Sequence, residues 1–290
     1  MSRMVLLRIV FTVLERIAPT AGGKLGFRLW CTPPKAARDR TKRRDDRPGP
    51  GRVSTVMMAD ERRVAVESWG PADGQPVYLL HGWGGWRGQM GGFIQPLADA
   101  GYRVVALDTP AHGDAGPGQL GGSRSHMQES GDALATVADA FGPPAAAIAH
   151  SGGCTAMAAA VRDGLEIPRM VFIAPSADPV GVMHRIADAL GAGPKIRAAM
   201  RARAEELAGR SLDDYDVTSL AAFTTPPPTL VIHDDKDKEV PFSEGEAIVK
   251  SWERSTWHPT TGLGHRRILR DAGVIETVTA YLTDPTVAGT

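Results

Sequence analysis

The stretch A-A-I-A-H-S-G-G-C-T-A, residues 146–156, places a serine between a short apolar run and an alanine-rich run. A strand that leads directly into a serine turn and then a helix holds the serine in a strained, exposed conformation. The residues two positions away must then be small, and here they are Ala149 and Gly153. The pattern predicts a turn at Ser151 and a helix whose first N–H groups point at the serine oxygen. The alternative is that Ser151 is only a small residue in a tight turn.

Further apolar runs occur before and after this stretch, and helical patterns separate them. Two strands are predicted within 53–69 around a turn at Asp60-Glu61, and others at 76–82, 102–108, 145–151, 169–175 and 229–235. Helices are predicted at 124–141, 154–163 and 243–252. Continuous apolar strands that alternate with helices are typical of a parallel sheet covered on both faces. We therefore predict an α/β fold with a mostly parallel central sheet flanked by helices.

Composition narrows the function classes. The 33 basic and 33 acidic residues cancel, so no overall field favours nucleic acid or an anionic membrane. The two cysteines, Cys31 and Cys154, fit neither a disulfide framework nor a zinc site, and no pair of histidines has metal-ligand spacing. We expect a cytoplasmic protein that has no metal and binds no nucleic acid.

The N-terminal segment, residues 1–52, precedes the alternation. Its first part is apolar, with helical spacing of Leu7, Val10, Leu14 and Ile17, and is too short and too charged to span a bilayer. We expect an amphipathic helix that docks on the body of the protein; attachment to a membrane surface or a dimer contact is the alternative. A charged connector follows, and its mixed signs favour a solvated linker over a nucleic-acid surface. Its charged residues include Asp39, Arg40, Lys42, Arg43, Arg44, Asp45 and Asp46.

The predicted core comprises residues 53–175 and 226–290. The segment between them, 176–225, is far longer than one crossover needs, and its pattern is helical. Ile196, Met200 and Ala204 lie on one face of the expected helix. We expect a small helical lid over the C-terminal edge of the sheet, where insertions tend to shape binding sites. A purely structural insertion is the alternative.

Polar residues follow several other predicted strands. The relevant stretches are L-L-H-G-W-G-G (79–85), V-V-A-L-D-T-P-A-H-G-D-A (104–115), L-V-I-H-D-D-K-D-K-E-V-P (230–241) and T-T-G-L-G-H-R-R-I-L (260–269). The backbone N–H of Trp83 can join that of Gly152 to form an oxyanion hole. His265 lies in a glycine-flanked loop and can accept a proton from Ser151. The order along the chain is serine, aspartate, histidine.

These four stretches and the serine turn resemble the α/β-hydrolase superfamily over about residues 53–283. The resemblance implies an α/β-hydrolase fold in which Ser151 is the nucleophile, Asp237 the acid and His265 the base. It also implies that the amides of Trp83 and Gly152 form the oxyanion hole. Two positions depart from the usual pattern: Ala149 replaces a glycine, and Asp234 stands where a glycine is common.

Four carboxylates compete as the acid that orients His265. Asp234 and Asp235 lie at the exit of the strand T-L-V-I-H, whereas Asp237 lies in the loop beyond it and precedes V-P. Asp178 follows the neighbouring strand, from which some members of the fold supply their acid. We favour Asp237, because the triad needs a carboxylate on a loop just past a strand end.

The expected activity is hydrolysis of a small carboxylic ester of short-to-medium acyl chain through an acyl-enzyme, with no cofactor. A thioesterase, lactonase or acyltransferase would use the same three residues, and a ligand-binding receptor on this fold would keep them with little turnover. His150, Trp86 and Met90 are candidates to line the substrate pocket; the latter two would alternatively only pack their loop.

Overall fold

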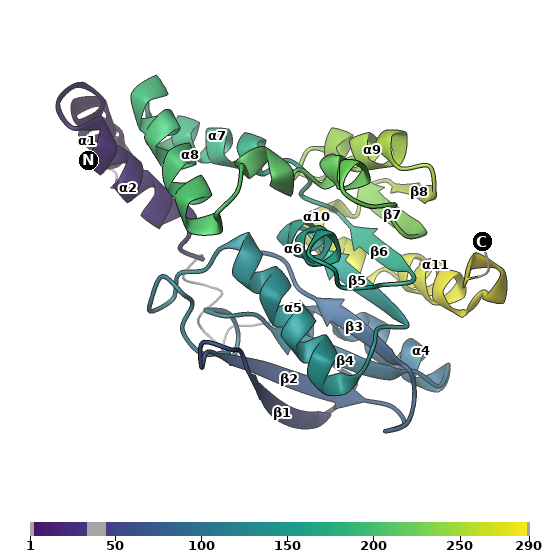
Figure 1. The fold of residues 1–290 in the computed structure, drawn as a ribbon. Helices are drawn as coiled ribbons and strands as arrows, with labels where there is room; N and C mark the ends of the chain where they lie inside the picture. The colour runs from purple at the N-terminus through teal and green to yellow at the C-terminus, as the bar shows by residue number, and fades with distance from the viewer. Residues whose placement is uncertain (1–2, 34–44, 289–290) are drawn as a thin grey trace.

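The computed structural model describes residues 3–33 and 45–288, and within them the chain forms one eight-stranded sheet with the order β1-β2-β4-β3-β5-β6-β7-β8 (Figure 1). The strands are β1 (Arg52–Met57), β2 (Arg63–Trp69), β3 (Pro76–Leu80), β4 (Arg103–Asp108), β5 (Ala146–His150), β6 (Met170–Ile173), β7 (Thr229–Asp234) and β8 (Ser255–Thr260). Strands β4, β3, β5, β6, β7 and β8 are parallel, whereas β2 is antiparallel to both β1 and β4. The predicted α/β fold is confirmed.

Helices cover both faces of the sheet. On one face lie α5 (Met127–Phe141), α6 (Gly152–Arg162) and α9 (Phe242–Ser251). On the other face lie the 3-10 helix η2 (Arg87–Phe93), α4 (Ile94–Asp99) and α11 (Ala272–Thr283). Because both faces are covered, all five residues of β3 and of β5 are buried. This double burial explains why the inner strands read as continuous apolar runs.

Strand β8 was not predicted from the sequence. Its residues, S-T-W-H-P-T, include a proline and are only partly buried. The strand lies at the edge of the sheet, where Pro259 is opposite His233 of β7. A proline is tolerated at an edge because one side of the strand needs no ladder hydrogen bonds.

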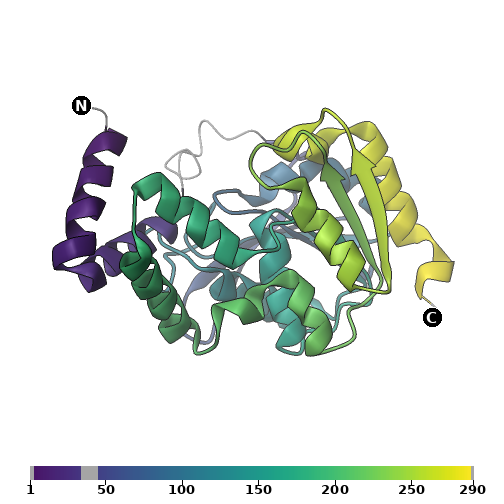
Figure 2. The same cartoon turned by 90° about the horizontal axis from the view of Figure 1, so that it is seen from above.

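The N-terminal segment forms two helices, α1 (Arg3–Ile17) and α2 (Pro19–Trp30), where the sequence analysis expected one (Figure 2). Pro19 begins the second helix, a position at which its missing N–H costs nothing. Only part of the expected apolar face docks: Leu7 and Leu14 pack against the cluster around the buried Phe11, but Ile17 is 75% exposed. The connector residues 34–44, with Asp39, Arg40, Lys42, Arg43 and Arg44, lie outside the described residues.

The outer side of α1 is apolar. Val5, Leu6, Ile9 and Val13 are each about half exposed, at 45–51%. Its polar residues Arg8 and Glu15 instead face the body of the protein, where Arg8 donates to the backbone oxygens of Asp188 and Ala189. In the part of the chain that the structure describes, every helix is too short or too polar to cross a bilayer.

The segment 176–225 folds into α7 (Pro179–Leu190), α8 (Pro194–Ala208) and the 3-10 helices η3 (Leu212–Tyr215) and η4 (Val217–Ala222). The apolar face of α8 packs against α2 rather than against the sheet. Three glycines of α2 allow this approach: a Cβ at Gly22, Gly23 or Gly26 would lie 2.4–2.6 Å from atoms of Ile196, Ala199 or Met200. Both carboxylate oxygens of Glu15 accept hydrogen bonds from the first turn of α8, from the N–H groups of Lys195 (2.9 Å) and Ile196 (3.0 Å).

Candidate active site

Ser151 lies in a strained turn between β5 and α6. Its φ of 53° and ψ of −125° are values that non-glycine residues rarely adopt. Its N–H donates to the backbone oxygen of Ile173 at 3.0 Å, which ties the turn to the neighbouring strand. A Cβ at Gly153 would lie 2.7 Å from the backbone oxygen of His81. The close approach of α6 to the end of β3 therefore requires the glycine that the sequence analysis identified.

Three side chains form one hydrogen-bonded series at the C-terminal edge of the sheet. His265 Nε2 lies 3.0 Å from Ser151 Oγ, and His265 Nδ1 lies 2.7 Å from Asp237 Oδ2. His265 belongs to the short helix α10 (Gly264–Arg267), and Asp237 follows β7. The structure thus brings together the serine, histidine and aspartate that the sequence analysis selected, in the geometry of a nucleophile, a base and an orienting acid.

Asp237 is held as a carboxylate. Its Oδ1 accepts hydrogen bonds from the N–H groups of Glu239 (2.7 Å) and Val240 (2.9 Å). Its Oδ2 also lies 3.3 Å from Nε2 of the buried His233. Burial alone would raise the pKa of Asp237, but hydrogen bonds with His233, His265 and Val240 outweigh it and lower the pKa well below its ordinary value.

The three competing carboxylates are engaged elsewhere: two accept from backbone N–H groups and one lies on the surface. Asp178 caps α7 by accepting from the N–H of Gly181 at 2.7 Å. Asp234 accepts from the N–H groups of Lys236 (3.0 Å) and Leu263 (2.8 Å), and so shapes the loops that carry the acid and the histidine. Asp235 is exposed and pairs with the neighbouring lysine.

His150 has a contact that the sequence analysis did not predict. It lines the cleft, as expected, but its Nε2 also donates to the backbone oxygen of His265 at 2.9 Å. Burial, followed by the nearby His265, lowers the pKa of His150 to about 3, so the ring is neutral. The neutral ring thus holds the backbone of His265, whose side chain lies against Ser151 Oγ. These two histidines are 115 positions apart, and no local pattern signals their contact.

The loop after β3 approaches Ser151 closely. A Cβ at Gly82 would lie 2.8 Å from the Ser151 Cβ, and one at Gly152 would lie 3.6 Å from the Trp83 backbone nitrogen. His81 braces this loop, since its Nδ1 lies 2.8 Å from the Gly82 oxygen and its Nε2 3.3 Å from the N–H of Thr109. The backbone nitrogen of Trp83 therefore lies close to Gly152, the residue after the serine.

A buried ion network fixes the same loop. Arg87 pairs with Glu67 at 2.9 Å, with Asp114 at 3.0 Å and with Asp108, whose Oδ1 also accepts from the Arg87 N–H. The side chains of Arg87, Glu67 and Asp108 are each at most 5% exposed. The network joins the loop after β3, which borders Ser151, to the loop after β4.

We expect Arg87→Met to destabilise the protein by about 3–5 kcal/mol, because it leaves the buried Asp108 carboxylate without its cation, whereas Glu67 still pairs with Arg47. Urea unfolding followed by circular dichroism measures this loss. Arg203→Met is the matched control, since Arg203 pairs with Glu206 on the surface, where an ion pair contributes about 0–1 kcal/mol. Equal losses of stability in the two variants would contradict the role given to Arg87.

A cleft of about 470 Å³ opens at Ser151 and His265. Two expected lining residues lie elsewhere: Met90 is fully buried with Phe93 and Ile94 against the sheet, and Trp86 is buried beneath the Arg47 guanidinium, 5.1 Å from its ring centre. Of the two possibilities, the packing one holds: Met90 turns into the core, and Trp86 packs against the guanidinium groups of Arg47 and Arg87. From the same segment, Gln89 lines the cleft.

Several residues that the sequence analysis missed also line the cleft. They are Trp30 of α2, Met127 of α5, and Val182, Arg185 and Ile186 of α7. Glu244 of α9 holds the start of α7 by accepting from the N–H groups of Ala177 and Asp178, and it pairs with Arg185 at 3.0 Å. Among residues 3–33 and 45–288, there is no group of three or more His, Cys, Asp or Glu side chains arranged to hold a metal.

The fold and this site define an α/β hydrolase. The model of the alpha/beta hydrolase family matches residues 77–277, and the chain belongs to that family.

Among curated proteins, a non-heme chloroperoxidase from Burkholderia pyrrocinia is 34% identical over 102 residues, which cover 34% of each chain. The chain thus spans about a third of the length of the curated relatives it matches. An esterase from Rhodococcus sp. superposes with a TM-score of 0.59 at 19% identity, over 80% of this chain and 98% of the esterase. A membrane phospholipase A, described as a bacterial virulence factor, has a TM-score of 0.61 at 16% identity and covers 99% of this chain and 97% of its own. At these identities the two superpositions define the fold.

Proposed function

We propose that the protein is a serine hydrolase that cleaves carboxylic esters of short-to-medium acyl chain through an acyl-enzyme. The observation that carries this proposal is the series from Ser151 through His265 to Asp237, at 3.0 and 2.7 Å, in a cleft. The strained turn at Ser151 and the approach of the Trp83 backbone nitrogen to Gly152 support the same chemistry.

In the proposed mechanism, Ser151 Oγ attacks the ester carbonyl carbon while His265 Nε2 takes the hydroxyl proton. Asp237 accepts the Nδ1–H hydrogen bond and keeps the imidazole in the tautomer that leaves Nε2 free to accept. The carbonyl oxygen becomes an oxyanion, which the N–H groups of Trp83 and Gly152 stabilise. The protonated His265 then gives its proton to the leaving alkoxide. Water, deprotonated by His265, attacks the acyl-enzyme carbonyl; the bond to Ser151 Oγ then breaks, His265 returns the proton to Oγ, and the acid leaves.

The experiment that tests this function is a panel of p-nitrophenyl esters, acyl thioesters and lactones, assayed with the purified protein. We expect fast turnover of p-nitrophenyl acetate to hexanoate. Faster turnover of thioesters or lactones would assign the same three residues to one of those substrate classes. A ligand that raises Tm without being consumed, together with no turnover of any ester, would instead indicate a receptor and contradict the proposal.

The proposal includes a cytoplasmic location. Cys31 and Cys154 are both buried free thiols, and unpaired cysteines are typical of a reducing compartment.

A further inference from the structure

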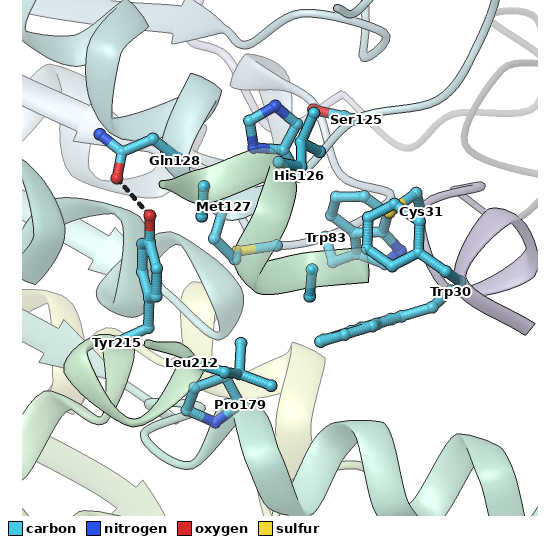
Figure 3. A pocket seen from close by; sticks show the side chains of 14 residues that line it. Trp30, Cys31, Trp83, Ser125, His126, Met127, Gln128, Pro179, Leu212 and Tyr215 are labelled. Carbon is cyan, nitrogen blue, oxygen red and sulfur yellow. Dashed lines mark hydrogen bonds between the residues drawn. The ribbon is translucent and has the colours of Figure 1, made fainter. Parts of the chain in front are cut away.

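A second cavity, mostly apolar, adjoins the cleft. Figure 3 shows the residues that line it. The cavity has a volume of about 60 Å³ and shares four lining residues with the cleft: Trp30, Trp83, Met127 and Pro179. These four residues form the neck between the two spaces. Met127 is also close to the serine turn, since its Sδ would lie 3.5 Å from a Cβ at Gly152. The cavity therefore begins beside Ser151.

The walls beyond the neck come from α2, from the end of α8 and from η3. They include Phe27, Leu207, Ala208, Leu212 and Tyr215. The Tyr215 hydroxyl is engaged, because it donates to Gln128 Oε1 at 2.6 Å (Figure 3). A ligand in the cavity would therefore contact mainly apolar side chains.

Cys31 and His126 also line the cavity, and both side chains are uncharged at neutral pH. Burial, with a smaller effect of Glu129, raises the pKa of the Cys31 thiol to about 12. Burial, with a smaller effect of Arg62, lowers the pKa of His126 to about 4. A charged group of a substrate would find no opposite charge there, whereas an alkyl group would leave water for apolar surface.

We propose that this cavity binds the end of the acyl chain while the ester carbonyl lies at Ser151, so that α2 and the α8–η3 segment set the preferred chain length. The inference rests on the function proposed above and specifies its substrate as an ester of a straight, unbranched acid. The cavity has room for about two methylene groups, judged from the roughly 30 Å³ that one water occupies in the liquid. Phe27 and Trp30 lie outside the residues 77–277 that match the family model, so the α2 part of the cavity wall is an addition to the matched core.

The test is the ratio of kcat/KM for p-nitrophenyl hexanoate to that for p-nitrophenyl acetate. Each methylene that enters the cavity is expected to raise kcat/KM about fourfold in the wild-type protein. Ala208→Phe places a ring in the cavity and is expected to lower this ratio at least about tenfold, which corresponds to two lost methylenes. Ala202→Phe is the matched control, because Ala202 is an exposed residue of the same helix. It should keep the wild-type ratio.

Trp30→Ala tests the same wall in the opposite direction. It removes an indole from the neck, so the chain length with the highest kcat/KM should move from hexanoate towards octanoate or decanoate. If Ala208→Phe does not fold, this shift alone decides the inference. An unchanged chain-length profile in a folded Ala208→Phe or in Trp30→Ala, judged by circular dichroism, would overturn it.

A binding experiment separates this inference from the proposed function. In Ser151→Ala, indole fluorescence is titrated with sodium hexanoate and with sodium acetate, because Trp30 and Trp83 line the cavity. We expect hexanoate to bind about tenfold more tightly than acetate, and adding Ala208→Phe to remove this difference. Equal binding of the two acids would overturn the inference even if the wild type hydrolyses esters. Preferential hexanoate binding without any ester turnover would uphold the cavity and overturn the proposed function.

Discussion

Ser151→Ala should lower kcat/KM for p-nitrophenyl butanoate by at least about 10³-fold, as loss of the nucleophile does in other triads. The substitution removes the oxygen that lies 3.0 Å from His265 Nε2. It deletes only a hydroxyl at a turn whose side chain is partly exposed, so the folded structure should persist. Steady-state kinetics measures the loss, and circular dichroism checks the fold.

A fluorophosphonate probe gives an independent measurement of the same prediction. The probe should label the wild-type protein and fail to label Ser151→Ala. Ser176→Ala is the matched control, because Ser176 lines the same cleft and contacts Ser151 through its backbone N–H. That variant should still be labelled. Hydrolysis that survives in Ser151→Ala would remove the basis of the proposed mechanism.

Asp237→Asn should lower kcat by about 10⁴-fold, the loss seen when the acid of a well-studied triad is changed to its amide. Asparagine has nearly the same size, but its amide group can present N–H to His265 Nδ1 and favour the wrong tautomer. Asp178→Asn and Asp235→Asn are the controls, since these carboxylates cap α7 and lie on the surface, respectively. A larger loss in Asp178→Asn than in Asp237→Asn would show that the acid has been misassigned.

The same variant should show a characteristic dependence of stability on pH. The pKa of Asp237 is lowered in the folded state, chiefly because hydrogen bonds with His233, His265 and Val240 overcome the opposing effect of burial. The carboxylate therefore stabilises the folded protein above the unfolded pKa of about 3.9, and this stabilisation is lost as pH falls through the folded value. The difference in free energy of unfolding between wild type and Asp237→Asn should shrink as the pH falls below about 4. Urea titrations at several pH values measure it. A difference that grows in acid would contradict the ionised state of Asp237.

The fold was predictable where burial of an element produces a recognisable pattern in its own sequence. Strands covered on both faces are continuous apolar runs, and the turn at Ser151 demands small neighbours such as Gly153. Strand β8 escaped prediction because an edge strand needs neither an apolar run nor the absence of proline.

The site was predictable only in its local motifs. The serine, the acid and the histidine each follow a strand end, so the shared edge of a parallel sheet brings them together. The remaining contacts depend on packing between distant segments, as with Trp30 in the cleft and His150 against His265. Trp86 and Met90 show the converse, because an apolar side chain in a loop fits a core and a substrate pocket equally well in sequence.

Gly22, Gly23 and Gly26, which let α2 pack closely on α8, restrict how the sequence of these two helices can evolve. A Cβ at Gly23 would lie 2.4 Å from the Cβ of Ala199. The interface between the two helices therefore has no space for a larger side chain on one helix alone. Descendants of this sequence should therefore change the two helices together, with a larger residue on one matched by a smaller one on the other. The catalytic residues at the strand ends and the chain-length preference set by α2 and α8 would then evolve separately. Substitutions in α2 and α8 would occur in matched pairs.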